Sequence, residues 1–474
     1  MEHLSAGILK QLPAADLETA DRLLKRELSE DFHKIVVLDD DPTGVQTVHD
    51  VSVYTDWSME SIASGFREDN KVFYILTNSR GMTQEETETI HKEIGEAVVR
   101  VSKEQKKPFL LISRSDSTLR GHYPLETETL RACLEKGGIH ADGEIITPYF
   151  KDGGRFTIGN IHYVKQGDEL VPAAETEFAR DKTFGYTHSS LPEYIEEKTK
   201  GRYPAESVTC ISLEDLRGLR LDQIEEQLMR AENFEKICVN AADDVDLTVF
   251  SIALYRAVRN GKYFIFRSAA GLVKVMGGVS DRPLLTRTEM IRKESGKGGL
   301  VVVGSHTEKT TEQLSELLKL KTAVPIAFDS DKVLEGEEAF AAEIRRCVKE
   351  EEQAILTGKT AVCYTKRTLL SFQGDTKEEA LLRSLKISEG VQGLVSGLSV
   401  PPAFLIAKGG ITSSDIGKKA LKVRRAEVMG QILPGIPVWK TGPESRFPEI
   451  PYVIFPGNVG SETDLRRAVE ILEA

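Results

Sequence analysis

The sequence has few cysteines, and none of them has the spacing of a zinc site or a redox pair. The 474 residues include five cysteines, which lie far apart and form no CxxC pair. This pattern predicts small buried side chains in a reducing compartment. The five are Cys133, Cys210, Cys238, Cys347 and Cys363.

Long hydrophobic runs and a basic excess are also missing. No stretch reaches the roughly 18 apolar residues of a membrane span, and the acidic, amphipathic N-terminus does not resemble a signal peptide. The 62 Lys and Arg residues face 74 Asp and Glu residues, a net charge of −12. This balance argues against a general affinity for nucleic acid or anionic membranes, which need a concentrated basic surface. We expect a cytoplasmic protein.

Several motifs that would identify an enzyme class are absent from the sequence. There is no GxxxxGK[ST] phosphate-binding loop, no GxGxxG fingerprint after a strand, no HExxH and no GxSxG. These absences argue against P-loop nucleotidases, dinucleotide-binding dehydrogenases, HExxH metalloproteases and α/β-hydrolases.

Short apolar runs alternate with charged, helix-compatible stretches along the whole chain. Hydrophobic residues make up 40% of the sequence, and this alternation is typical of parallel sheets covered by helices. The first series of runs is 34–40, 71–78, 108–115, 143–150, 208–213, 236–241 and 263–269, and the second is 299–305, 323–328, 359–365, 403–410 and 452–458.

A polar, Gly- and Lys-rich stretch separates the two series. Residues 281–299 show no apolar periodicity, which favours a domain boundary near 290–298. We therefore predict an α/β fold with two α/β domains and mainly parallel sheets. The expected parts are an N-terminal helical extension at 1–30, a first domain at 31–295 and a second at 296–474.

Polar clusters follow the strands of the first domain, at the sheet edge where ligands of open α/β folds bind. The run 34–38 is followed by three aspartates, Asp39, Asp40 and Asp41, and then by Pro42, Thr43 and Gly44. Three like charges repel one another unless a cation, a donor-rich substrate or a proton compensates them. We favour a functional site, and a structural loop with one helix-capping aspartate is the alternative.

Three further segments of the first domain have a similar composition. Thr77–Arg80 and Ser113–His122 combine hydroxyls, guanidinium groups and a carboxylate, which suits a polyhydroxylated, anionic small molecule. Lys151 and Arg155 flank paired glycines and could hold a carboxylate or phosphate. Helix caps with solvated arginines and an ordinary hairpin are the alternatives.

The strands of the second domain end in loops of Gly, Ser and Thr. The loops are 304–310, 408–415 and 456–464, and the first of them opens a predicted helix. Backbone N–H groups and hydroxyls at a helix N-terminus favour phosphate. Three such loops suit a nucleotide, although each alone could be an ordinary turn.

Together these strand ends resemble the four-carbon acid sugar kinase family, which contains D-threonate, D-erythronate and 3-oxo-tetronate 4-kinases. The resemblance spans nearly the whole chain. Its first-domain motifs are matched by Asp40–Gly44, Ser79-Arg80, Asp116–Gly121 and Pro148–Arg155. Its second-domain motifs are matched by Gly304–Thr307, Gly409–Thr412 and Gly457–Gly460.

The resemblance implies a first domain that binds the sugar acid, a second that binds ATP, and an active-site cleft between the domains. Mg²⁺ is the expected metal, with no ligands assigned. The implied substrate-binding residues are Asp40, Arg80, Ser115, Asp116, Ser117, Thr118 and Arg155. The implied ATP-binding residues are Ser305, Thr307, Gly409, Gly410, Thr412, Gly457, Asn458 and Gly460.

Our sequence hypothesis is an ATP-dependent kinase that phosphorylates a four-carbon acid such as threonate, erythronate or 3-oxo-tetronate, or a related hydroxy acid. Arg80 and Arg155 would grip the carboxylate, and either Asp40 or Asp116 would be the catalytic group that orients or deprotonates the acceptor hydroxyl. The partners would be the acid and ATP, and a homodimer is compatible with the sequence.

Two other functions stay open at this point. Asp39-x-Asp41-x-Thr43 after an apolar strand is similar to the nucleophile motif of Mg²⁺-dependent phosphatases of the haloacid dehalogenase type. The third candidate is a non-catalytic protein that binds a sugar acid.

Overall fold

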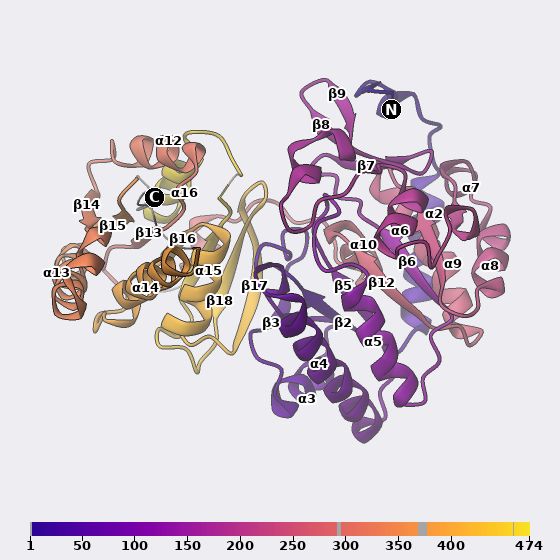
Figure 1. Ribbon diagram of the computed structural model, residues 1–474, viewed down its shortest axis with the longest axis horizontal. Helices are drawn as coiled ribbons and strands as arrows, with labels where there is room; N and C mark the ends of the chain where they lie inside the picture. The colour runs from indigo at the N-terminus through magenta and orange to yellow at the C-terminus, as the bar shows by residue number, and fades with distance from the viewer. Residues whose placement is uncertain (1, 292–294, 368–376, 458) are drawn as a thin grey trace. The chain divides into compact units, whose positions relative to one another are not determined.

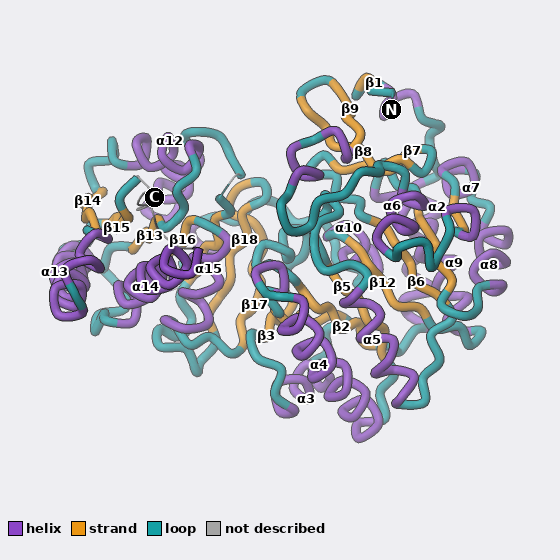
Figure 2. The backbone as a smooth tube through the Cα atoms, in the orientation of Figure 1, coloured by secondary structure: helices purple, strands orange, loops and turns teal. Residues whose placement is uncertain are grey.

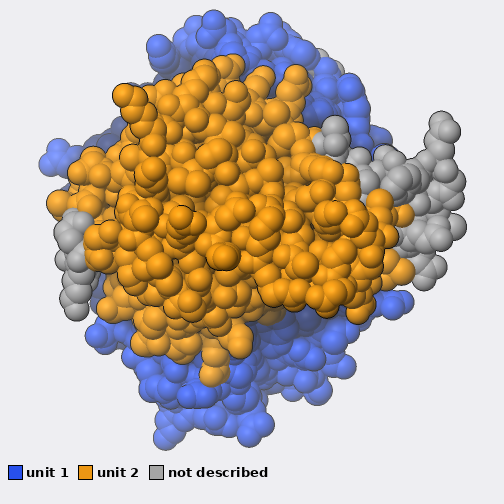
Figure 3. Space-filling model, turned by 90° about the vertical axis from the view of Figure 1, so that its left-hand side faces the viewer, with its two compact units in different colours: residues 1–281 blue, residues 282–474 orange. Residues whose placement is uncertain are grey.

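The computed structural model describes residues 2–291, 295–367, 377–457 and 459–474. The chain forms two compact units, Met1–Asp281 and Arg282–Ala474, called unit 1 and unit 2 below (Figure 3). Residues after Asp281 belong to unit 2 because the Leu285 N–H donates to the Gln431 carbonyl at 2.8 Å and Leu285 and Met290 are buried in its core. The sequence suggests a boundary at 295–296, which lies after residues 282–295 rather than before them.

The main sheet of unit 1 is parallel throughout (Figure 1). Every residue of β2, β4, β5, β6 and β12 is buried, so both faces of the central strands are covered and continuous apolar runs fit them. The strand order is β10 (Thr209–Ile211), β11 (Glu235–Val239), β6 (Gly143–Thr147), β12 (Phe264–Ser268), β5 (Phe109–Arg114), β2 (Lys34–Asp39), β4 (Val72–Leu76) and β3 (Val51–Tyr54).

Two groups of helices pack around this sheet (Figure 2). The first is α3 (Met59–Arg67), α4 (Gln84–Gln105) and α5 (Leu125–Lys136), which share one apolar cluster with the sheet. In the second, α2 (Leu17–Glu30), α7 (Leu213–Arg217), α8 (Leu221–Arg230) and α10 (Ala270–Met276) contact α9 (Asp244–Arg259). The remaining helices are α1 (Ile8–Gln11), α6 (Leu191–Lys198), η1 (Ser79–Gly81), η2 (Ala173–Glu175), η3 (Glu177–Arg180) and η4 (Ala205–Ser207).

A small antiparallel sheet stands beside the main sheet of unit 1. Its order is β1 (Leu4–Ser5), β9 (Glu169–Pro172), β8 (Ile161–Gln166) and β7 (Arg155–Ile158). The His162 ring on β8 contacts the Ser117 carbonyl at 2.8 Å, which ties this sheet to the loop after β5. Strand β7 thereby carries Arg155 toward the carboxyl edge of the main sheet.

Unit 2 contains a second sheet with parallel strands in its centre and a hairpin at one edge. The order is β17 (Arg425–Leu433), β18 (Ile436–Thr441), β19 (Pro451–Phe455), β16 (Leu405–Lys408), β13 (Leu300–Val303), β15 (Thr360–Thr365) and β14 (Ala323–Phe328). Only β17–β18 and β18–β19 are antiparallel pairs in the part of unit 2 that the structure describes.

The helices of unit 2 follow the parallel strands, except for the first, which precedes β13. They are α11 (Arg287–Met290), α12 (Glu308–Leu317), α13 (Glu337–Leu356), α14 (Lys377–Ser396), α15 (Gly410–Asp415) and α16 (Asp464–Glu473), with the shorter η5 (Ser330–Glu335) and η6 (Ile416–Ala420). Thr307 caps α12, accepting a hydrogen bond from the Thr310 N–H. The α/β fold with mainly parallel sheets is the one that the sequence predicts, and it is confirmed.

Candidate functional site

The charged residues of unit 1 gather where the carboxyl ends of four neighbouring strands meet. The strands are β12, β5, β2 and β4, in that order. Asp39 ends β2, Arg114 ends β5, and Arg80 lies in η1 just after β4. This edge is where ligands of open parallel sheets bind.

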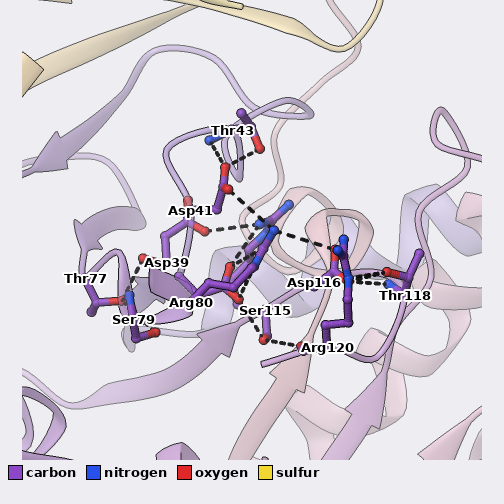
Figure 4. Close-up of polar contacts among 12 residues, drawn as sticks. Asp39, Asp41, Thr43, Thr77, Ser79, Arg80, Ser115, Asp116, Thr118 and Arg120 are labelled. Atoms are coloured by element: carbon purple, nitrogen blue, oxygen red, sulfur yellow. Dashed lines mark hydrogen bonds and ion pairs between the residues drawn. The ribbon is translucent and has the colours of Figure 1, made fainter. Parts of the chain in front are cut away.

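Arg80 lies at the centre of these charges (Figure 4). Its Nη2 and Nε atoms lie 2.6 and 3.1 Å from the two carboxylate oxygens of Asp40, a two-point contact that fixes both side chains. Its Nη1 lies 3.4 Å from Asp41 and 3.8 Å from Asp116. Arg80 therefore already neutralises carboxylates of the protein itself. Burial raises the pKa of Asp40, although Arg80 and Arg114 oppose it.

The three consecutive aspartates have three different environments. Burial raises the pKa of Asp39 to about 8, against the Arg114 guanidinium 3.3 Å away. Asp41 is partly buried, and Arg80 and the Thr43 hydroxyl and N–H together outweigh that burial and hold its pKa below the ordinary value. Gly44 packs onto Asp39 so closely that a Cβ at Gly44 would lie 2.1 Å from a carboxylate oxygen. Like-charge repulsion is thus relieved by the raised pKa values of Asp39 and Asp40 and by the neighbouring arginines.

Asp116 forms the second acidic centre, in the loop after β5. Its Oδ2 accepts from Arg120 Nε at 2.8 Å and from the Thr118 hydroxyl. Burial would raise the pKa of Asp116, but Arg80 and Arg120 outweigh burial and hold it well below the ordinary value. The Ser115 hydroxyl donates to Asp40 at 3.0 Å, which joins this loop to the first centre. Asp116 is therefore an ionised hydrogen-bond acceptor.

Arg155 differs from the other arginines of this edge. Its guanidinium lies 5.5 Å from the centre of the Phe178 ring, which Arg120 also covers at 5.0 Å. Its Nε is buried without a hydrogen-bond partner among the described residues, and burial lowers its pKa. Of the expected unit 1 residues, five share one network of hydrogen bonds and ion pairs, namely Asp40, Arg80, Ser115, Asp116 and Thr118. Arg155 contacts Phe178 beside Arg120, and the Ser117 carbonyl contacts the His162 ring.

The expectations from sequence missed two residues of this network. Arg267 Nη1 on β12 lies 3.2 Å from Glu126, and its Nη2 donates to the Arg120 carbonyl at 3.0 Å. Glu126 also accepts from the Ser79 hydroxyl at 2.8 Å. Arg267 lies near the end of the apolar run 263–269, so the strand-end rule could have found it. Glu126 had no such signal because it lies in the first turn of a helix.

Unit 2 contains a cavity of 340 Å³ at the carboxyl ends of β13, β15 and β16. This volume is within the range of about 300–1,000 Å³ of small-molecule sites. Five of the expected ATP-binding residues line it, namely Ser305, Gly409, Gly410, Thr412 and Gly457.

The remaining expected residues of unit 2 are not among the lining residues. The Thr307 hydroxyl donates to the Gly457 carbonyl at 3.4 Å, and the Gly460 carbonyl accepts from Lys309 Nζ at 3.3 Å. Asn458 lies outside the described residues. Gly304 is required by close approach, since a Cβ there would lie 2.3 Å from the Thr412 hydroxyl. The three glycine-containing loops therefore contact one another around the cavity.

The cavity has a second wall that the sequence did not indicate. Gln392 and Ser388 on α14 donate to the Asp415 carboxylate at 3.2 and 3.1 Å. Apolar side chains complete this wall, which offers both hydrogen-bonding groups and a surface for a flat ring. They are Ile387, Val391, Ile411 and Ile416.

Two family models match the chain, one over each unit. Residues 35–276 match a sugar-binding N-terminal domain, and residues 300–465 match a nucleotide-binding C-terminal domain. The chain belongs to the four-carbon acid sugar kinase family. The family match agrees with the chemistry of the two candidate sites. The charged site of unit 1 lies in the sugar-binding domain, and the glycine-lined cavity of unit 2 lies in the nucleotide-binding domain.

Solved structures share the fold of this family member. A protein from Salmonella typhimurium LT2 superposes with a TM-score of 0.66 at 17% identity, covering 92% of this chain and 99% of that one. A Haemophilus influenzae protein superposes with a TM-score of 0.61 at 18% identity, covering 93% of this chain and 100% of that one. No curated protein matches the sequence.

The described residues contain neither a metal-binding cluster nor a helix that could span a membrane. Among the described residues, no group of three or more His, Cys, Asp or Glu side chains is arranged to hold a metal ion. The Mg²⁺ that the family implies therefore has no protein ligands that can be named. None of the described helices combines the length and the apolar character needed to cross a membrane.

Proposed function

We propose that this protein is a kinase that transfers the terminal phosphoryl group of ATP to a hydroxyl of a small sugar acid. The acid would be a four-carbon compound such as threonate, erythronate or 3-oxo-tetronate, or a related hydroxy acid. The main support for this proposal is that one chain contains two different sites. Unit 1 has a network of carboxylates and guanidinium groups, and unit 2 has a glycine-lined cavity.

The residues of unit 1 have different roles in this proposal. Asp116 is ionised and would accept a hydrogen bond from the acceptor hydroxyl, which orients that hydroxyl toward phosphate. Asp40 has a raised pKa, whereas that of Asp116 is lowered, so Asp40 would be the more basic carboxylate and the better proton acceptor of the two. Arg155 lacks a carboxylate partner among the described residues and would hold the carboxylate of the acid.

The cavity of unit 2 would hold the nucleotide. Backbone N–H groups near Gly409 and Gly410, with the Ser305 and Thr412 hydroxyls, suit a phosphate chain. The wall of Gln392 and Asp415 suits the polar edge of a base or sugar. Mg²⁺ would neutralise phosphate charge in a reaction of this type, and most of its ligands would come from phosphate and water.

The environment of Asp39 argues against the phosphatase alternative. In that mechanism the first aspartate of the motif is an ionised, accessible nucleophile. Asp39 is only 1% exposed, packs onto Gly44, and has its pKa raised to about 8 by burial. A protonated, enclosed carboxyl is a poor nucleophile.

The test is ADP release by the purified protein with ATP and Mg²⁺ across threonate, erythronate and 3-oxo-tetronate, with a control that lacks acid. We expect one acid to stimulate ADP release well above the control. Phosphate release from a phosphoester without nucleotide would instead support the phosphatase. Binding of an acid without ATP consumption would support the non-catalytic protein.

A further inference from the structure

Lys408 is a buried lysine at the candidate nucleotide site that the proposed function leaves without a role. It ends β16, and its side chain is 0% exposed. Its Nζ donates to the carbonyls of Pro456 and Gly457 at 2.5 and 3.1 Å. In the described part of the chain, no carboxylate lies within ion-pair distance of this ammonium group. Carbonyl oxygens satisfy its hydrogen bonds but leave its positive charge without a counter-charge.

The position of Lys408 connects it to the wall of the cavity. Gly409, the next residue, and Gly457, which accepts its hydrogen bond, both line the cavity. The Gly457 carbonyl also accepts from the Thr307 and Thr310 hydroxyls at 3.4 and 3.3 Å. Lys408 therefore fastens the loop after β19 to β16, while the start of α12 holds the same loop from the other side.

Two further cations use the same kind of contact nearby. Lys309 on α12 donates to the Gly460 carbonyl at 3.3 Å, and Arg367 after β15 donates to the Ser305 carbonyl. The Arg367 Nη1 atom is buried without a hydrogen-bond partner in the described residues. Each of the three cations thus holds a loop through a carbonyl oxygen. Among the described residues, none of the three has a carboxylate within ion-pair distance, and positive charge of this kind favours a bound anion.

Among the described residues, the elements packed around Lys408 bring few other groups that could change its charge. They are Lys309 on α12, the Phe455 ring on β19 at 4.3 Å, His306 in the loop after β13, Asp415 on α15, which pairs with Lys419, and Asp464 at the start of α16, which bonds to Ser461 and Arg467. Burial and the charge of Lys309 lower the pKa of Lys408 to about 7. Without an anion, Lys408 is therefore partly neutral near neutral pH.

We propose that Lys408 is a positioning residue of the nucleotide site, and that a bound phosphate chain stabilises its charged form, so that nucleotide binding takes up a proton. The inference rests on the proposed function because it takes the ligand of the cavity to be a nucleotide. A phosphate chain would supply the missing negative charge beside the loop that Lys408 holds. No bond is made or broken on Lys408, and the proton comes from the buffer.

The test is a calorimetric titration of the full-length protein with ADP, without metal, at about pH 8, where ADP itself is fully ionised. Two buffers with different enthalpies of ionisation, HEPES and Tris, reveal the number of protons taken up. We expect the wild type to take up between about half a proton and one proton per ADP. We also expect its affinity to fall by up to about tenfold per pH unit above pH 7.

Lys408→Arg is the matched variant, because arginine keeps the charge and the donors but does not release its proton at this pH. We expect this variant to bind ADP with no proton uptake and with little dependence on pH. Lys349→Arg on the exposed face of α13 is the control and should behave as the wild type does. A purely structural lysine would give the same proton count in all three proteins.

The outcomes separate this inference from the function on which it rests. Wild-type protein that binds ADP without taking up a proton would overturn the role of Lys408 and leave the kinase proposal intact. Wild-type protein that does not bind ADP or ATP at all would overturn both. The wild-type measurement decides between these outcomes even if Lys408→Arg does not fold.

Discussion

The two candidate sites occupy the same position in their sheets but are built from opposite chemistry. In unit 1, carboxylates and arginines such as Asp40 and Arg80 neutralise one another before any ligand binds. In unit 2, the strand-end side of the cavity is formed by glycine backbone and hydroxyls, and the nearby cation Lys408 has no carboxylate partner among the described residues. A ligand of unit 1 must therefore bind to a network whose charges are already balanced. An anion in unit 2 would instead supply the negative charge that Lys408 lacks.

This difference predicts where single substitutions act. Removing one charge in unit 1 leaves its partners buried and unpaired, so fold and activity change together. Removing one polar group in unit 2 leaves backbone donors in place, so affinity changes more gently.

The largest effect is expected for Asp116→Asn. The amide keeps the size of the side chain but loses the charge that faces Arg80 and Arg120. We expect kcat to fall by about 100-fold or more, measured by ADP release at saturating ATP. The control is Asp181→Asn, because Asp181 is 3.8 Å from Arg120 on a more exposed side chain and should retain activity.

Asp40→Asn extends this prediction. The change also removes the charge and one of the two oxygens that accept from Arg80, so we expect the same loss of activity with a lower melting temperature. Unchanged turnover in both Asp40→Asn and Asp116→Asn would refute the assignment of the acceptor site to this network.

A second prediction compares one buried glutamate from each unit. Glu126 in unit 1 contacts Ser79, Arg267 and His91. Burial would raise its pKa, but His91 and Arg267 lower it below the ordinary value. In unit 2, both carboxylate oxygens of Glu351 are buried without a partner among the described residues, and burial raises its pKa from 4.5 to about 8.

These opposite shifts predict opposite effects on stability. The Glu351 carboxyl stabilises the fold fully only below about pH 4.5, and this contribution is lost as the pH rises toward 8. Glu351→Gln should therefore raise the free energy of unfolding by about 2–4 kcal/mol at pH 8 and change it little at pH 4. Glu126→Gln should destabilise the protein at neutral pH. Urea unfolding at both pH values tests the pair, and a loss of stability in Glu351→Gln at pH 8 would contradict the argument.

The sequence was informative about the fold because buried parallel strands are continuous apolar runs. The runs 34–40 and 71–78 correspond to β2 and β4, and 323–328 coincides with β14. The short strand β3 and the hairpin β17–β18 were missed. In β17, apolar residues are interrupted by polar ones and by Gly430, which has a positive φ. Residues 425–433 therefore do not form a continuous apolar run.

The same physical reason limits what the sequence says about the sites. Strand ends are visible in a sequence, so the strand-end rule points to Asp40, Arg80 and Ser305. Glu126 and Gln392 lie on helices, where a polar residue is usually solvated, and only tertiary packing brings them to Arg267 and Asp415. The sequence also does not reveal which carboxylate each arginine contacts. Arg80 pairs with Asp40, whereas Arg155 has no carboxylate partner among the described residues.

A third prediction tests how tightly the aspartate loop of unit 1 is packed. A methyl group at Gly44 would overlap the Asp39 carboxylate at 2.1 Å. We expect Gly44→Ala to lower the free energy of unfolding by about 1–3 kcal/mol and to reduce activity. Gly81→Ala is the matched control, since no atom lies within 4 Å of its Cβ position. Equal stability of the two variants in urea would show that Asp39 moves aside without cost.

The smallest effect is expected at the polar wall of the unit 2 cavity. Gln392→Ala removes one donor to Asp415, but Ser388 at 3.1 Å and Lys419 at 2.8 Å still hold that carboxylate. We therefore expect ADP affinity to fall by only about threefold, the effect of one hydrogen bond of ordinary strength. Gln353→Ala on exposed α13 controls for the loss of a glutamine. If both Gln392→Ala and Asp415→Asn bind ADP as the wild type does, the nucleotide does not use this wall, and the contrast between a balanced and an unbalanced site would rest on the glycine loops and Lys408 alone.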